Sequence, residues 1–164
     1  MDVMTKQQRH DCMARIKGKN TKPELIVRRF LWSHGLRYRI NYSRLPGKPD
    51  LVLTKYRTVI FVNGCFWHGH DGCRYYRLPK SNVEYWTSKI ENNKARDQRD
   101  RELLSKMGWN VVQIWECQLL PKSREAYLES LLNLLDGIFL ESHSVKRYAL
   151  PDDDDLAIAA ENSD

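Results

Sequence analysis

Long apolar runs are missing from this sequence. No stretch approaches the ~18 apolar residues that a membrane-spanning helix needs, and residues 1–20 (MDVMTKQQRHDCMARIKGKN) carry charge where a signal peptide is apolar. We therefore expect a protein that stays in the cytosol. Wholesale disorder is also excluded, because 41% of the 164 residues are hydrophobic. This length fits one domain with short appendages.

Acidic residues are scarce outside the C-terminus. Residues 151–164 contain six acids and no Lys or Arg, so residues 1–150 carry 15 acids against 27 basic residues, a net charge of +12. Such a body attracts polyanions, because each Lys or Arg near a phosphate releases condensed counterions. A merely solvated basic surface is the alternative, and charge alone does not choose between them.

Cysteine is limited to four residues, in a chain without an export signal. Disulfides are therefore unexpected, and metal binding or simple burial is favoured.

The spacing of apolar residues indicates an α/β domain over 21–140, between a basic arm at 1–20 and an acidic, disordered tail at 141–164. The expected elements are a short helix in the arm, a helix over 22–34, strands over 36–40, 51–53, 58–62 and 109–115, a helix or helix pair up to 107, and a last helix up to about 140. Ser123 should cap the last helix, and capping boxes are expected at 21–24 and 81–84.

The order of these elements predicts a mixed sheet flanked by helices. The strands at 51–53 and 58–62 form an antiparallel hairpin, with Leu53 expected opposite Val59. The last strand returns through a helical crossover, which makes it parallel to its neighbour. Trp109 and Trp115 share one parity on that strand and are assigned to the core.

Asp50 directly precedes the hairpin, after Pro49. The expected register places it opposite Val62, beside Asn63 and a His-rich loop. Mg²⁺ prefers oxygen ligands and usually takes one or two carboxylates in addition to water and substrate phosphate. Asp50, the Val62 carbonyl and a DNA phosphate would satisfy this preference. A solvated turn acid is the alternative.

A Pro-Asp pair entering a hairpin is typical of the restriction-nuclease fold. The usual following strand carries an acid, any residue and a lysine, whereas this strand reads Phe61-Val62-Asn63. Another group must activate water, and His68 is the nearest candidate because an imidazole can act as a general base near neutral pH. Zinc ligation is the alternative role for His68.

Cysteine and histidine cluster in the loop 63–80. Zn²⁺ takes Cys and His ligands tetrahedrally, and we favour His70, Cys73 and the distant Cys117, with the fourth ligand unassigned. Cys65 and Cys12 fit better as buried small apolar residues. A catalytic zinc is the competing use of this cluster.

Two aromatic pairs stand out, Phe66-Trp67 in the loop and Tyr85-Trp86 at a helix start. Helical aromatics are more often core residues. Adjacent rings in a loop are harder to bury together, and apolar side chains can wedge between DNA base steps.

Together these residues resemble very short patch repair (Vsr) endonucleases, bacterial mismatch nickases, over residues 9–120. The shared motifs are M-x-x-I at 13–16, NTKPE at 20–24, LPGKPD at 45–50, VNGCFWHGH at 62–70, Pro79, Tyr85-Trp86, K-x-x-x-N at 89–93, Arg96-Asp97, GW at 108 and WEC at 115. LPGKPD combined with GCFWH and WEC makes the resemblance highly specific.

The resemblance implies a restriction-endonuclease-like fold with a structural zinc. It also implies a Mg²⁺-dependent enzyme that nicks the thymine strand of a T·G mismatch 5′ to the thymine, where 5-methylcytosine has deaminated. Double-stranded DNA with such a mismatch would be the partner, and the protein a monomer. A zinc-stabilised DNA-binding module without catalysis, or a restriction endonuclease that cuts matched DNA, are the alternatives.

The resemblance also assigns roles by position. The matched residues are Asp50 and Val62 at Mg²⁺, His68 as the catalytic histidine, Glu24 as an acid near the metals, His70, Cys73 and Cys117 at zinc, Phe66, Trp67 and Trp86 as the aromatic wedge, and Met13 in an inserting arm. Two departures are visible. Asn63 replaces a common histidine, and the loop between His70 and Cys73 has one additional residue, which Gly72 would absorb.

Overall fold

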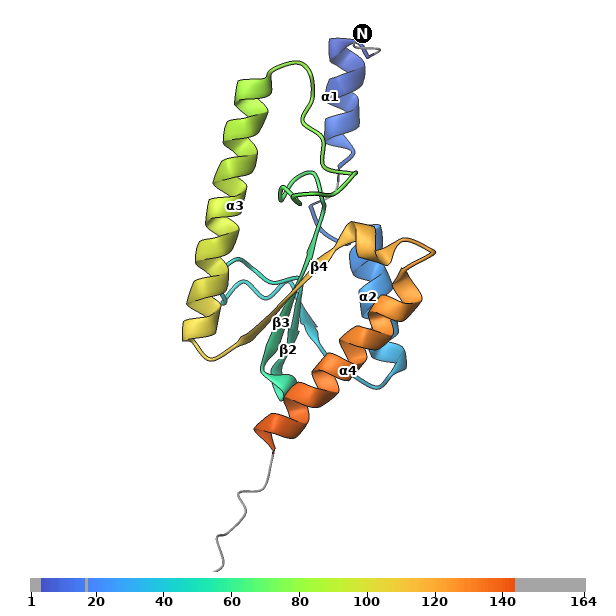
Figure 1. Ribbon diagram of the computed structural model, residues 1–164, viewed down its shortest axis with the longest axis vertical. Coiled ribbons are helices and arrows are strands. Elements are labelled where there is room, and N and C mark those ends of the chain that lie inside the picture. The colour runs from blue at the N-terminus through green and yellow to red at the C-terminus, as the bar shows by residue number, and fades with distance from the viewer. Residues whose placement is uncertain (1–3, 17, 144–164) are drawn as a thin grey trace, which may run out of the picture.

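The computed structural model describes residues 4–16 and 18–143 (Figure 1). The elements are α1 (Lys6–Ala14), α2 (Lys22–Ser33), β1 (Arg39–Ile40), β2 (Leu51–Leu53), the 3-10 helix η1 (Thr54–Tyr56), β3 (Thr58–Asn63), α3 (Val83–Lys106), β4 (Asn110–Trp115), the 3-10 helix η2 (Glu116–Leu119) and α4 (Arg124–Ser142). The tail prediction for residues beyond 143 lies outside the described residues. None of the helices in the described part is long and apolar enough to cross a membrane.

One mixed sheet, in the order β1-β2-β3-β4, forms the centre of the fold. The β1–β2 and β2–β3 pairs are antiparallel, and β3–β4 is parallel through the α3 crossover. The expected α/β class, hairpin and crossover are confirmed.

The register predicted for the β2–β3 hairpin was wrong by one residue. Leu53 pairs with Thr58, not Val59, because η1 and the left-handed Arg57 (φ 46°) close the turn in four residues. Both hairpin strands are buried on both faces, so their sequences carry no in–out alternation that could fix the register.

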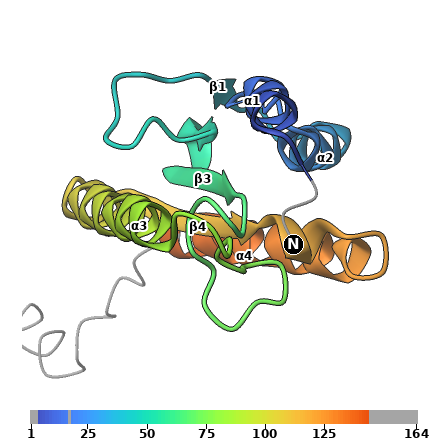
Figure 2. The ribbon, with the colours of Figure 1, turned by 90° about the horizontal axis from the view of Figure 1, so that it is seen from above.

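Helices cover both faces of the sheet (Figure 2). Leu51, Leu53 and Ile60 point to the face that packs against α2 and α4. Val52 and Val59 point to the other face, where they meet Leu104 of α3. This alternation follows from the period of two along a strand, and it produces an α/β/α sandwich.

Several local expectations need correction. The strand expected over 36–40 is reduced to Arg39–Ile40, and Ile40 is exposed. No capping box forms at 81–84, because Asn82 is the N-cap, in a left-handed conformation without a side-chain cap bond. Ser123 is an N-cap position, but its hydroxyl donates back to carbonyls of the preceding turn, including that of Gln118 at 3.2 Å.

Of the two tryptophans that the sequence assigns to the core, only Trp109 packs there. Trp109 packs against the cluster under α3, as expected. Trp115 is half-buried and stacks on His70, with ring centroids 4.1 Å apart and planes 4° from parallel. Its position at the end of β4 therefore serves the loop 64–82 rather than either core cluster.

The ends of β3 and β4 create the functional end of the molecule. Because the strands are parallel, Asn63 lies opposite Trp115, and the loop 64–82 and η2 emerge side by side. α1 and the N-terminal half of α3 extend beyond the sheet at this end (Figure 1). α1 has no buried residue.

Candidate active site and metal centre

A cleft of about 950 Å³ opens at the ends of the strands. Its walls come from six regions: the segment before α2, the start of α2, the LPGKPD loop, the end of β3 with the following loop, the middle of α3, and the start of η2. Glu24, Asp50, Val62, Asn63 and His68 all line it. The structure thus brings the expected catalytic residues into one cavity.

Asp50 is held by the neighbouring strand. The Val62 N–H donates to its Oδ2 at 2.7 Å, so the residue pair expected from the sequence meets despite the shifted register. Burial raises the pKa of the Asp50 carboxyl from 3.8 to about 6, and repulsion from Glu24 adds to this, while the Val62 hydrogen bond opposes it. A cation beside Asp50 would therefore stabilise its negatively charged form.

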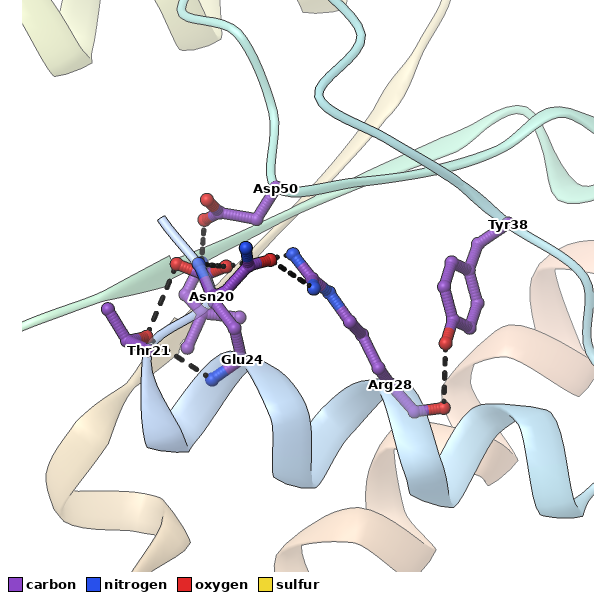
Figure 3. A network of polar contacts seen from close by, with 7 residues as sticks. Asn20, Thr21, Glu24, Arg28, Tyr38 and Asp50 are labelled. Carbon is purple, nitrogen blue, oxygen red and sulfur yellow. Dashed lines mark hydrogen bonds and ion pairs between the residues drawn. The ribbon is translucent and has the colours of Figure 1, made fainter. Parts of the chain in front are cut away.

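Glu24 enters the cleft from the first turn of α2 (Figure 3). Its Oε2 accepts from the Asn20 N–H at 3.1 Å, and its Oε1 accepts from the Thr21 hydroxyl at 3.2 Å. The Thr21 hydroxyl in turn caps the helix by accepting from the Glu24 N–H. The capping box expected at 21–24 is thus only half formed, because the Glu24 carboxylate accepts from the N–H of Asn20 rather than from that of Thr21. Arg28 also donates to Glu24 Oε2 at 3.0 Å. This buried acid, 4% exposed, is therefore fixed from three sides.

His68 is paired with an acid that the sequence analysis did not single out as a site residue. Its Nδ1 lies 2.5 Å from Oδ2 of Asp97 on α3. If Nδ1 carries the proton donated to Asp97, Nε2 is left as the acceptor, which is the arrangement of a general base oriented by a carboxylate. The half-buried His68 reaches the cleft in this pair.

α3 also fixes the loop that carries His68. Asn93, one turn before Asp97, donates from Nδ2 to the Trp67 carbonyl at 2.9 Å. Gly69 has φ +62° and packs so closely on α3 that an added Cβ would lie 2.8 Å from Ile90 Cγ2. With the Lys94 Nζ to Asp71 Oδ2 bond of 2.9 Å, three polar contacts and one close approach hold the loop against the helix.

The end of β4 contributes a further acid. Glu116 lines the cleft, and its Oε1 accepts from the Cys65 N–H at 3.0 Å. Asn63 is 6% exposed at the end of β3. The cleft therefore has a neutral amide at the end of β3.

Cys65, His70, Cys73 and Cys117 form the second centre. One ligand atom from each lies within 4.8 Å of the others, and Cys117 Sγ is 3.5 Å from His70 Nδ1. This set could hold a metal ion, and three sulfurs with one imidazole nitrogen match the ligands that zinc prefers. The interpretation of Cys65 as only a buried apolar residue is corrected: it is fully buried, but its sulfur is part of the cluster. The same interpretation of Cys12 was wrong, because Cys12 is exposed on α1.

The cysteines differ in their protonation. Burial raises the pKa of Cys65 to about 12 and also raises that of Cys117. A backbone hydrogen bond from Tyr75 lowers the pKa of Cys73. Gly72, between His70 and Cys73, has φ +74° and open space around it.

The aromatic residues gather on one surface beside the cleft. Phe66, Trp67 and Trp86 meet edge to face, with centroids 5.2–5.8 Å apart among Phe66–Trp67, Phe66–Trp86 and Trp67–Trp86. All three are half-buried and belong to neither core cluster. Met13 on α1 is 37% exposed, outside the core.

Three functional candidates were missed by sequence reasoning. Asp97 was noted only within the shared Arg96-Asp97 motif, with no role assigned, because its contact with His68 spans 29 residues. Arg28 gave no signal beyond its helical spacing from Glu24. Cys65 did have a signal, because it follows β3 as Cys117 follows β4, and neighbouring parallel strands bring their ends together.

Several known proteins are similar in sequence to this chain over most of its length. The family model for the DNA mismatch endonuclease Vsr matches residues 1–74. The type II nicking enzyme V.XorIIP of Xanthomonas oryzae pv. oryzae is 47% identical over 136 residues, which cover 82% of this chain and 97% of the relative. V.NmeAIP of Neisseria meningitidis serogroup A, also a type II nicking enzyme, is 47% identical over 122 residues, covering 74% and 86%.

The DNA mismatch endonuclease Vsr of Escherichia coli K12 is 39% identical over 139 residues, which cover 83% of this chain and 88% of the relative. These relatives are nucleases by name. The chain belongs to the Vsr family of DNA mismatch endonucleases.

Proposed function

We propose that this protein nicks the thymine strand of a T·G mismatch in double-stranded DNA, on the 5′ side of the thymine. The observation that carries the proposal is one cleft in which two acids, Glu24 and Asp50, face the His68–Asp97 pair. The mismatch and nicking activities named for the relatives agree with a single-strand cut. One nick needs one catalytic centre, and one chain holds all these groups, which supports a monomer acting on DNA in the cytoplasm.

Asp50, Glu24 and Val62 would hold Mg²⁺. Asp50 fits a cation because burial and Glu24 both disfavour its charged form, and oxygen donors are those that Mg²⁺ prefers. The ion would supply charge neutralisation at the scissile phosphate and at the leaving oxygen. Glu24 is held by its hydrogen bonds and does not need to move to take part.

His68 would act as the general base. Its Nδ1 bond to Asp97 fixes the ring and stabilises the imidazolium that forms when Nε2 accepts a proton from the attacking water. Asn63 would replace the family's histidine with a neutral amide, which can hydrogen-bond a phosphate but cannot take up a proton.

The remaining groups would grip the DNA. Lys48, Arg96, Arg99 and Arg101 line the cleft and suit the phosphate backbone. Phe66, Trp67 and Trp86 would wedge beside the mismatch, where stacking is already weakened, and Met13 would insert from the arm. Zn²⁺ on Cys65, His70, Cys73 and Cys117 would fix the loop that carries Phe66 and Trp67.

The proposal is tested on matched duplexes. Purified protein is incubated with Mg²⁺ and end-labelled duplexes that differ only in T·G against C·G at one position, with label on either strand. We expect one nick, 5′ to the thymine, in the mismatched duplex alone. Cuts in both strands of the matched duplex would instead indicate a restriction endonuclease, and binding without cutting would indicate a DNA-binding module.

Replacing His68 with Ala, or Asp97 with Asn, should slow nicking by about 10²–10⁴-fold. An amide at position 97 can donate to Nδ1, which leaves the proton on Nε2 and removes the base. Single-turnover nicking rates, zinc content and binding of the T·G duplex are measured together. Zinc and DNA binding should be retained, and exposed Glu102→Gln on the same helix is the control. Loss of zinc in His68→Ala would place His68 among the zinc ligands and leave the base unidentified.

A further inference from the structure

Arg28 is a buried cation directly behind the acids of the cleft. It lies one helical turn after Glu24 and is 8% exposed, although arginine is rarely buried. The described residues that line the cleft include Glu24 but not Arg28. Arg28 can therefore influence the cleft in two ways: through the residues it contacts (Figure 3), and through its positive charge, which acts to lower the pKa of Asp50.

The guanidinium connects two residues that also contact each other. Nη2 donates to Glu24 Oε2 at 3.0 Å, and Nη1 donates to Asn20 Oδ1 at 2.7 Å. The Asn20 N–H donates to the same Glu24 oxygen at 3.1 Å. Asn20 stands where the N-terminal arm joins α2, with φ 55°. The network thus joins the arm to an acid of the cleft.

This arrangement is not explained by stability alone. Within the described residues, Arg28 Nε is the one buried side-chain polar atom without a hydrogen-bond partner, and such an unsatisfied donor costs about 1–3 kcal/mol. The helix backbone is secured independently, because the Tyr38 hydroxyl donates to the Arg28 carbonyl at 3.1 Å. Burying the Arg28 guanidinium next to Asp50 and Glu24 therefore costs folding free energy, which indicates a role other than stability.

We infer that Arg28 is a positioning residue for the cation site: its fork holds the Glu24 carboxylate beside Asp50 and ties it to Asn20. The inference rests on the proposed function of these acids. Two carboxylates in one cleft repel each other, and a free Glu24 side chain would turn away from Asp50. A planar guanidinium can bind two partners in fixed geometry, whereas a lysine ammonium cannot reproduce that fork.

Charge and positioning predict opposite results. A positive charge near a cation site weakens cation binding by repulsion, so removal of Arg28 would strengthen binding if its charge were what mattered. If the fork positions Glu24, removal weakens binding, and Arg28→Lys weakens it as well despite the retained charge.

The test compares Arg28→Met, Arg28→Lys and Asn20→Ala with the wild type. Arg29→Met, exposed on the same helix, is the control. Binding of Mn²⁺ to zinc-loaded, DNA-free protein is followed by electron paramagnetic resonance, and nicking is measured over a range of Mg²⁺ concentrations. Both Arg28 variants should bind Mn²⁺ about 10–100-fold more weakly and need correspondingly more Mg²⁺, with an unchanged KM for DNA. Asn20→Ala should show a smaller loss.

Arg28→Met that is folded, zinc-loaded and binds Mn²⁺ as tightly as the wild type, or more tightly, would overturn the inference. Should Arg28→Met fail to fold, Arg28→Lys and Asn20→Ala decide it by the same measure, and wild-type affinity in both overturns it. Failure of the proposed function looks different, because the wild type would then not nick the T·G duplex.

Discussion

Asp50→Asn should abolish detectable nicking while the metal-free protein becomes more stable at neutral pH. An amide is a poor ligand for the cation that the cleft is proposed to hold, so the rate should fall at least about 10³-fold. Binding of the T·G duplex without divalent cations should change little, because it depends on Lys and Arg contacts to phosphate.

The stability gain follows from the pKa of Asp50. In the folded protein this pKa is raised from 3.8 to about 6 by burial, so the folded state binds the proton more tightly than the unfolded state does. The carboxylate therefore destabilises the fold increasingly as pH rises from about 4 to 6, and the full effect persists above 6. Asn avoids this cost, and the gain should be about 1–3 kcal/mol at pH 7.5 and vanish below pH 4.

Urea unfolding at pH 4 and 7.5, without added divalent cations, measures this gain. Asp136→Asn, which removes an exposed acid from α4, should show none. Mg²⁺ should stabilise the wild type but not Asp50→Asn. A variant that still nicks, or that has the same stability as the wild type at both pH values, would contradict the assignment of Asp50.

Cys65→Ser should lose zinc and destabilise the protein by roughly 3 kcal/mol or more. Structural zinc contributes its binding free energy to folding, about 10–16 kcal/mol in small zinc domains, and part of this disappears with one ligand. The matched control is Cys12→Ser, because Cys12 is exposed on α1, outside the cluster. Zinc content and thermal unfolding report both effects.

Zinc binding should also release protons. The raised pKa values of Cys65 and Cys117 mean that both are protonated in the metal-free protein at neutral pH, and zinc binds the thiolates. Affinity should therefore fall as the pH falls, and calorimetry in buffers of different ionisation enthalpy should detect the protons. Stoichiometric zinc in a fully stable Cys65→Ser variant would exclude Cys65 as a ligand.

Local sequence signals identified much of this molecule. Proline and glycine in LPGKPD mark the loop that delivers Asp50, and short apolar runs mark β2 and β3. The register of that hairpin was not readable, because strands buried on both faces have no polar side to fix it. Asp50 still meets Val62, since its side chain reaches along the neighbouring strand to the Val62 N–H.

The sequence by itself determined the α/β class, the crossover and the set of residues with metal-ligand and acid chemistry, because periodicity, turn residues and side-chain type are local properties. Only the tertiary structure decided which of them act together. Parallel pairing of β3 and β4 places Cys65 beside Cys117, packing of α3 places Asp97 on His68, and α2 carries Arg28 behind Glu24. The two residues of these pairs are 52, 29 and 4 positions apart in the sequence. Even for the nearest pair, Glu24 and Arg28, the proposed role depends on Asp50, which the sheet places beside them.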